Sequence, residues 1–192
     1  MPIPFVPYKK EYAEQMRILV ALLGGKLTPE AARPGRPPSP YPRLTGLFQN
    51  LPVQIRVIQR ATRDGADPLS TDKYLDILFE SPCSLQMRAQ PKGRYWWIRK
   101  LLWWKTITTG DKHLDRDYAF SSPKAGRVRK VLRHKKVKSQ IVQLAPFDRL
   151  SISPDHLQLR YRITSQQAFM AHHLAEVFRR MLRLSRLFQN LG

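Results

Sequence analysis

The sequence predicts an α+β protein in which an antiparallel meander sheet carries an N-terminal helix, a middle helix and a long basic C-terminal helix. Three observations support this fold class. Apolar residues recur at helical spacing near both ends of the chain, and in several short segments between them they alternate with polar residues. Turn residues separate the alternating segments, as they do in hairpins. The strands are not interleaved one by one with helices, so a parallel, doubly wound sheet is not expected.

The first part of the chain predicts an arm, a helix and a connector. In residues 1–7 proline alternates with apolar residues, which favours an extended arm. From Tyr8 to Leu23 the apolar residues have helical spacing, and Gly24-Gly25 would end that helix. Residues 28–42 contain six prolines and one glycine, which excludes a helix interior or a central strand. We therefore expect a single domain over residues 8–192 with a proline-rich connector at residues 28–42.

Four later segments alternate apolar and polar residues with a period of two, which is typical of half-buried strands. They are residues 53–57, 75–79, 85–89 and 157–163. Leu150–Ile152 is expected to pair with the last of them across a tight turn. In that last strand we expect one face to be buried and the other exposed. The buried residues would be Leu157, Leu159, Tyr161 and Ile163, and the exposed ones Arg160 and Arg162.

Two further helices follow from the pattern. Ser122 and Pro123 have the residue types of an N-cap and a first helical position, so the middle helix would begin there and run to about His134. Its apolar face would consist of Val128, Val131 and Leu132. Residues 165–188 predict a long C-terminal helix with an apolar stripe on one side and a stripe of arginines on another.

Several short motifs occur in the order found in a known group of proteins. They are Gly24-Gly25 after the first helix, Pro42–Gly46 at the entry to the meander, Thr109-Gly110-Asp111 followed by Asp115, and Leu150–Ile163 as a terminal hairpin before a helix. In this arrangement the chain resembles bacterial soluble domains of unknown function that are often attached to predicted transmembrane helices. The resemblance implies the same layout over most of the chain and supplies no activity, cofactor or site residue.

Positive charge is the most unusual property of the composition. The chain has 34 Lys and Arg and 14 Asp and Glu, which gives a formal net charge of +20 at pH 7. Residues 86–138 alone hold 16 basic and three acidic residues. This imbalance indicates a polyanionic partner, although a solvated helix face would also be basic. The predicted polyanion contacts are Arg127, Arg129, Lys130, Arg133, Lys135, Lys136, Lys138, Arg179, Arg183 and Arg186.

All four tryptophans lie between Arg94 and Lys105, and we call these residues the tryptophan segment. Two pairs of indoles are seven residues apart, so on a helix each pair would lie on one side, two turns apart. Indole favours the lipid headgroup region and basic side chains are attracted to anionic lipid, which is typical of an interfacial element. Tryptophans that cap the core under a basic rim are the alternative. The predicted membrane or partner contacts are Arg94, Trp96, Trp97, Arg99, Lys100, Trp103, Trp104 and Lys105.

One acidic run could hold a cation. Asp111, His113, Asp115 and Asp117 recur at every second residue, which loosely resembles the start of a calcium loop. Ser122 occupies the twelfth position, where such a loop needs a glutamate. A tight turn whose acids pair with nearby bases is therefore the favoured interpretation.

The remaining reactive residues do not form a catalytic or metal motif. Cys83 is the single cysteine, which excludes an intramolecular disulfide, and a lone buried thiol is usually inert. His172 and His173 would point about 100° apart on a helix, so they cannot chelate one ion by themselves. We expect no catalytic residue, no metal and no cofactor, and the sequence leans against an enzyme.

Two functions remain. The first is a non-enzymatic, strongly basic peripheral module that binds an anionic membrane surface or a membrane-protein complex through the tryptophan segment. The alternative is a nucleic-acid-binding protein that uses the same bases on RNA or DNA. The longest apolar run is Ile18–Leu23, far below the roughly 20 residues of a membrane span, and the start of the chain does not resemble a secretory signal. We expect a cytoplasmic protein, peripheral to the membrane, and the sequence defines no oligomeric state.

Overall fold

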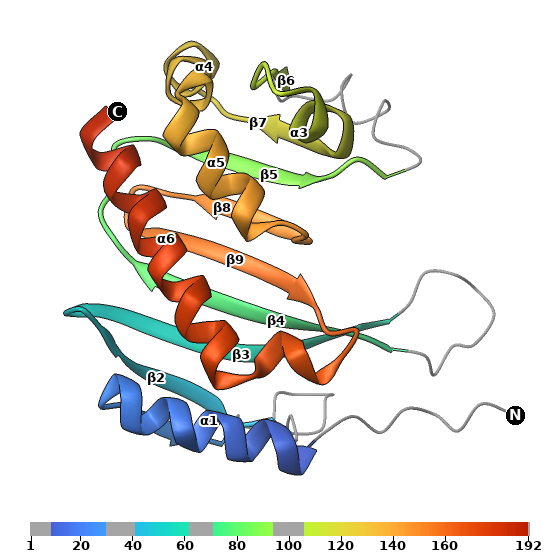
Figure 1. Cartoon of the computed structure of the whole chain (residues 1–192), viewed down its shortest axis with the longest axis vertical. Helices are drawn as coiled ribbons and strands as arrows, with labels where there is room; N and C mark the ends of the chain where they lie inside the picture. The colour runs from blue at the N-terminus through green and yellow to red at the C-terminus, as the bar shows by residue number, and fades with distance from the viewer. Residues whose placement is uncertain (1–8, 30–40, 62–70, 94–105, 192) are drawn as a thin grey trace, which may run out of the picture. The chain divides into compact units, whose positions relative to one another are not determined.

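The computed structural model describes residues 9–29, 41–61, 71–93 and 106–191 (Figure 1). The predicted arm at residues 1–7, residues 30–40 of the proline-rich connector and the tryptophan segment lie outside the described residues. None of the described helices is long and apolar enough to cross a membrane.

The fold is α+β with an antiparallel sheet, as the sequence predicts. In the described residues, nine strands follow the order β1-β2-β3-β4-β9-β8-β5-β7-β6. The strands are β1 (Lys26–Thr28), β2 (Arg43–Phe48), β3 (Leu51–Ala61), β4 (Thr71–Glu80), β5 (Met87–Pro91), β6 (Thr106–Ile107), β7 (Tyr118–Ser121), β8 (Arg149–Ile152) and β9 (His156–Arg162). The described helices are α1 (Lys9–Leu23), α3 (Lys112–Asp117), α4 (Ala125–Arg133), α5 (Lys135–Leu144) and α6 (Ala171–Leu191), with a short 3-10 helix η1 (Gln166–Phe169) before α6.

The chain divides into two compact units, and each unit uses two separate stretches of sequence. The first unit comprises Met1–Ile77 and Arg162–Ala175, and the second comprises Leu78–Tyr161 and Glu176–Gly192. Both β4 and α6 contribute residues to both units. The single domain expected over residues 8–192 stays a prediction.

The core of the first unit is built around α1. Its apolar residues at helical spacing are buried, and the Tyr12 ring meets the rings of Tyr41 and Phe169 edge-on at 5.3 Å and 5.7 Å between centroids. The helix ends at Gly24, whose φ of +54° is a left-handed conformation that favours glycine. Gly25 then passes so close to β2 that a Cβ there would lie 2.2 Å from the carbonyl oxygen of Thr45. The two glycines therefore have separate roles, one in ending the helix and one in allowing the close approach.

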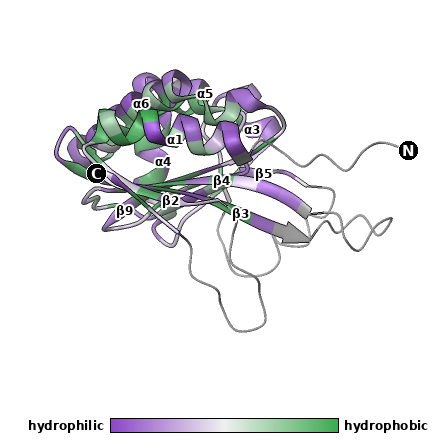
Figure 2. Ribbon diagram, turned by 90° about the horizontal axis from the view of Figure 1, so that it is seen from below, coloured by the Kyte–Doolittle hydropathy of each residue, from purple (hydrophilic) through white to green (hydrophobic). Residues whose placement is uncertain are grey.

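The core of the second unit lies between its strands and its helices, which cover one face of those strands (Figure 2). Gln189 of α6 donates a hydrogen bond from Nε2 to the carbonyl oxygen of Pro82 at 2.7 Å. The hydroxyls of Ser81 and Ser185 share a buried hydrogen bond. These hydrogen bonds hold the C-terminal part of α6 against the segment that follows β4.

Two sequence predictions about strand faces need correction. Leu157 and Leu159 of β9 are buried and Arg162 is exposed, as predicted, but Tyr161 and Ile163 are only half-buried. Arg160 was expected to be exposed and is instead 4% exposed. The alternation assumes that the second face of the sheet is open to water, whereas Arg160 lies on an interior strand directly opposite Arg149 of β8. A long arginine side chain can lie along such neighbours and be covered by them.

Several elements differ from the predicted ones. Strands β1, β2 and β6 were not predicted as strands, and the strand expected at residues 85–89 begins at Met87. The middle helix begins at Ala125 rather than at Ser122, whose hydroxyl oxygen accepts a hydrogen bond from the Lys124 amide at 3.0 Å. That side-chain bond stabilises a turn before the helix instead of capping it. Helix α5 was not predicted, and the expected helix at residues 165–188 is interrupted at Met170, which has extended backbone angles.

Candidate anion-binding site

Two consecutive helices carry a strongly basic surface in the second unit. The apolar residues of α4 and α5 recur at three- and four-residue intervals and are buried. The residues between them therefore face outward. Residues 125–144 contain seven Lys and Arg and no Asp or Glu. Of the predicted polyanion contacts here, Lys138 is half-buried, and the exposed ones are Arg127, Arg129, Lys130, Arg133, Lys135 and Lys136.

The C-terminal helix adds three predicted contacts, Arg179, Arg183 and Arg186, and Arg179 forms an ion pair. Arg179 lies 3.2 Å from the carboxylate of Glu176, and Arg180 lies 3.0 Å from it. Hydrogen bonds from Arg180 and then from Arg179 hold the pKa of Glu176 below its usual value. Arg183 and Arg186 lie further along α6 and are exposed, and no acidic residue follows Glu176 in this helix. The basic character of α6 is therefore concentrated toward its C-terminal end.

A hydrogen bond joins α6 to the C-terminal end of α5. Arg180 of α6 donates a hydrogen bond from Nη1 to the carbonyl oxygen of Gln143 near the C-terminus of α5. The hydroxyl of Tyr161 donates to the next carbonyl, that of Leu144, at 3.0 Å. Burial raises the pKa of Tyr161 above its ordinary value, so this hydroxyl keeps its proton. The carbonyl oxygens at this helix end thus have partners, as helix termini require.

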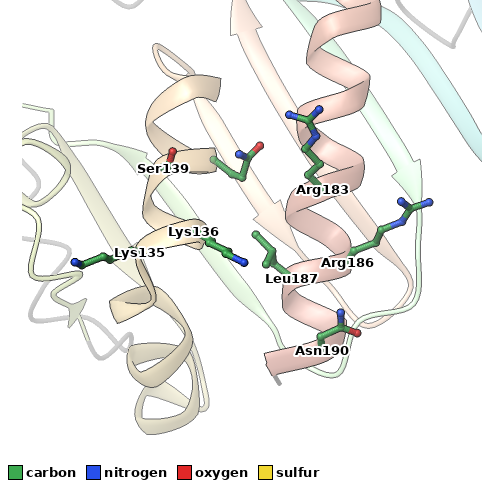
Figure 3. A pocket seen from close by; sticks show the side chains of 8 residues that line it. Lys135, Lys136, Ser139, Arg183, Arg186, Leu187 and Asn190 are labelled. Atoms are coloured by element: carbon green, nitrogen blue, oxygen red, sulfur yellow. The ribbon is translucent and has the colours of Figure 1, made fainter.

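A groove of about 500 Å³ lies between α5 and α6 (Figure 3). Its lining residues in α5 precede Gln143, which accepts the hydrogen bond from Arg180. The residues that line it are Lys135, Lys136, Ser139, Gln140, Arg183, Arg186, Leu187 and Asn190. Lys136 and Leu187 point toward one another across it, whereas Lys135 and Arg186 point away on opposite sides (Figure 3). Four sequence-predicted polyanion contacts therefore line one groove, although two of them point away from it.

The groove is suited to an anion. Four of its eight lining residues are basic and none is acidic. An anion bound there would accept hydrogen bonds from these cations. Hydrogen bonds from Lys or Arg to phosphate or carboxylate oxygens are among the strong ones. Among the described residues, the lining of the groove contains no imidazole or carboxylate beside Ser139.

Comparison with known proteins shows a likeness of fold. No family model matches the chain, and no curated protein sequence matches it. The structure is similar to the crystal structure of the mycobacterial trehalose monomycolate transport factor A, TtfA, with a TM-score of 0.61. The alignment covers 95% of this chain and 97% of TtfA at 9% sequence identity. An identity this low shows a common fold, so the functional residues of this chain have to be argued from its own side chains.

The acidic run is a structural turn. Asp111 caps α3 by accepting hydrogen bonds from the amides of His113 (3.0 Å) and Leu114 (3.1 Å). Asp115 accepts from the amide and the hydroxyl of Thr109 and from the amide of Gly110. These carboxylate oxygens are therefore already engaged by N–H and O–H donors, and the described residues contain no cluster that could hold a metal. The prediction that the acids pair with bases is correct only for Asp117, which binds Arg116 at 2.7 Å.

The other reactive side chains do not join the groove. Cys83 is buried, and burial raises the pKa of its thiol, which disfavours the nucleophilic thiolate. His172 and His173 are exposed on the first turn of α6, in a different unit from the groove. Neither feature assembles with the basic residues described above.

The predicted membrane contacts can be located only by their position in the sequence. The tryptophan segment lies outside the described residues and joins β5 to β6. Strand β6, which follows it directly, lies against α4. The segment therefore joins the described structure next to one of the two basic helices, within the second unit.

The uncharged residues of the groove were not predicted from the sequence. Ser139, Gln140, Leu187 and Asn190 carry no charge and belong to no motif. A signal was present for the first two, because Val137, Ile141 and Leu144 have the helical spacing of an apolar face. Extending the middle helix past His134 would have placed Lys136, Ser139 and Gln140 on one side of it, three and four residues apart.

Proposed function

We propose that this protein is a non-enzymatic binding module that attaches, from the cytoplasmic side, to an anionic membrane surface or to a membrane complex that presents one. The observation that carries the proposal is the strongly basic surface: α4 and α5 contain seven basic residues and no acidic one, and α6 adds two arginines at the groove. Each basic residue near an anionic leaflet contributes about 1 kcal/mol of attraction.

The tryptophan segment favours an anionic membrane over other polyanionic partners. Lasting attachment to a bilayer needs two signals, namely apolar insertion and electrostatic attraction. Four indoles within residues 94–105 would supply the first signal, and the segment continues directly into the strand that lies against α4.

Vesicle flotation tests the electrostatic part of the proposal with a charge-matched control. The test variant combines Arg127→Gln, Arg129→Gln and Lys130→Gln, all exposed on α4. The control combines Lys10→Gln, Arg17→Gln and Lys26→Gln, all exposed in the first unit. The wild type should float with anionic vesicles, stay behind with neutral ones, and lose binding as salt rises. We expect the α4 variant to bind several-fold more weakly than the control, although both lose three charges.

The tryptophan segment is tested in the same assay. Trp97→Ala together with Trp104→Ala should weaken flotation more than Arg127→Ala together with Arg129→Ala, and tryptophan fluorescence should shift to the blue when vesicles are added. A chain that ignores anionic vesicles but shifts RNA or DNA in a salt-dependent gel assay would overturn the membrane proposal and assign the basic surface to nucleic acid.

A further inference from the structure

We propose that the groove between α5 and α6 binds a phosphate ester that carries a neighbouring hydroxyl, as in a phosphoglycerol headgroup. The inference rests on the proposed membrane contact for the source of the ligand, because it names the chemical group that the basic surface would recognise. It differs from general attraction to an anionic surface, since it assigns recognition to particular atoms in one groove. Three features of the groove support it.

The first feature is the way the two helices separate. The link between Arg180 and Gln143 ties α6 to the C-terminal end of α5. Going backward along α5 by three and seven residues leads to Gln140 and Lys136, and going forward along α6 by the same steps leads to Arg183 and Leu187. These residues line the groove, which is the spacing expected for two neighbouring helices that run in opposite directions. The groove therefore lies along the interface between the two helices. These lining residues are one and two helical turns away from the Arg180–Gln143 hydrogen bond, on the same helix faces.

The second feature is the charge within it. Lys136 comes from α5 and Arg183 from α6, so each helix contributes a cation to the lining of a space of about 500 Å³. That volume lies within the range of small-ligand pockets, about 300–1,000 Å³. A lysine donates as a point charge and an arginine as a planar fork, and the two together suit the several oxygens of a phosphate group. A carboxylate offers fewer acceptor oxygens to such a pair.

The third feature is a buried acceptor. The Oε1 atom of Gln140 is buried and has no hydrogen-bond partner among the described residues. A buried polar atom without a partner is costly in a folded protein and calls for an explanation. Gln140 lines the groove, and a turn of its side-chain amide would bring this oxygen to a hydroxyl of a bound ligand. The cations and the amide oxygen together indicate a ligand with both an anionic and a hydroxyl group.

The closing experiment uses the whole chain and two sources of the same chemistry. Glycerol 3-phosphate and inorganic phosphate are titrated while the amide signals of Ser139, Gln140 and Asn190 are followed by NMR. The wild type should show saturable shifts at these signals and a preference for glycerol 3-phosphate. Lys136→Gln with Arg183→Gln should weaken binding by about tenfold or more, as loss of charge-assisted hydrogen bonds does. The charge-matched control, Lys10→Gln with Arg17→Gln, should bind like the wild type.

A second variant tests the hydroxyl contact. Gln140→Met keeps the length of the side chain and removes its oxygen, so it should abolish the preference for glycerol 3-phosphate over inorganic phosphate and leave phosphate binding intact. It should also leave the melting temperature unchanged or higher, because the buried acceptor is gone. A Gln140→Met chain that retains the preference would refute the assigned hydroxyl contact.

Vesicles separate this inference from the proposed function. Phosphatidylglycerol and phosphatidylserine vesicles of equal mole fraction carry the same net charge, but only the first presents free glycerol hydroxyls, so we expect tighter binding to phosphatidylglycerol. Equal binding to both, with no saturable shifts by glycerol 3-phosphate, would overturn the groove and leave the membrane proposal standing. Saturable shifts without binding to either vesicle would support the groove and overturn the membrane contact. If the control pair weakens ligand binding as much as the groove pair, the groove is not the site.

Discussion

At the scale of single residues, two glycines of the second unit differ in one respect that can be measured. Gly110 has a φ of +75°, and Gly126 lies within helix α4. Apart from the adjacent residues and, at Gly126, the backbone of its own helix, no atom lies within 4 Å of the position that a Cβ would take at either glycine. Any difference between their alanine variants therefore arises from backbone conformation and not from crowding.

This gives a first prediction. Gly110→Ala should lower the free energy of unfolding by about 1 kcal/mol, because a left-handed conformation costs an L-residue about that much. Gly126→Ala should raise it by about 0.5 kcal/mol, because alanine loses less backbone entropy than glycine in a helix. Urea denaturation of both variants measures the two effects, and changes of the same sign would contradict the prediction.

The second prediction concerns Asp115. Its carboxylate accepts hydrogen bonds from the Thr109 amide (2.8 Å), the Thr109 hydroxyl (2.9 Å) and the Gly110 amide (3.0 Å). Asp115→Ala leaves these donors without their acceptor and should cost about 1–3 kcal/mol in the free energy of unfolding. A chelator should leave the melting temperature of the wild type unchanged, since the donors already occupy the carboxylate. A melting temperature that drops with chelator would restore the cation site.

At the scale of elements, the structure shows which parts of the fold follow from local sequence. Strand β3 and the apolar face of α1 follow from residue spacing, because the apolar residues at the expected period are the buried ones in both elements. Helix α5 was missed because His134, with extended backbone angles, separates two helices that share one basic, proline-free sequence. Neither a glycine nor a proline marks that break.

Strands and the candidate site were less predictable for a different reason. Strand β1 is three residues long and β6 is two, which is too short for a period of two to be recognised. The bases of the groove were predicted individually from charge. Their meeting depends on the pairing of α5 with α6, a tertiary contact between segments about 45 residues apart that no local pattern encodes.

The third prediction tests that pairing. Arg180→Met removes the hydrogen bond to the Gln143 carbonyl and the ion pair with Glu176 while keeping most of the apolar stem. We expect a loss of about 1–2 kcal/mol in unfolding free energy, because the carbonyl loses a charged donor. Hydrogen exchange should speed up at the C-terminal end of α5 in particular. Uniform exchange across both helices would show that Arg180 does not hold them together.

At the scale of the whole molecule, buried thiol and phenol groups determine how stability depends on alkaline pH. Burial raises the pKa of Cys83, Tyr118 and Tyr161 in the folded protein. The unfolded chain therefore loses these protons at a lower pH than the folded chain, starting near the ordinary values of about 8.5 for a thiol and about 10 for a phenol. The fourth prediction is that the free energy of unfolding falls as pH rises above about 8.5.

A variant separates the contributions to this alkaline loss. Cys83→Ala removes the group with the lowest ordinary pKa, so its stability should stay level to a higher pH than that of the wild type before the tyrosines titrate. Denaturation in urea at several pH values between neutral and alkaline measures both curves. Parallel curves for the two proteins would show that the thiol does not contribute.

The division into two units has a consequence for synthesis of the chain. Neither unit is continuous in sequence, since the first needs Arg162–Ala175 and the second needs Glu176–Gly192. A ribosome that has released everything up to Tyr161 has therefore completed neither of them. We expect nascent chains stalled before residue 162 to be protease-sensitive throughout, and protection to arrive in both units only as the C-terminal helix emerges. Folding of both units would then wait for the residues that follow Tyr161, even though most of the strands are made earlier.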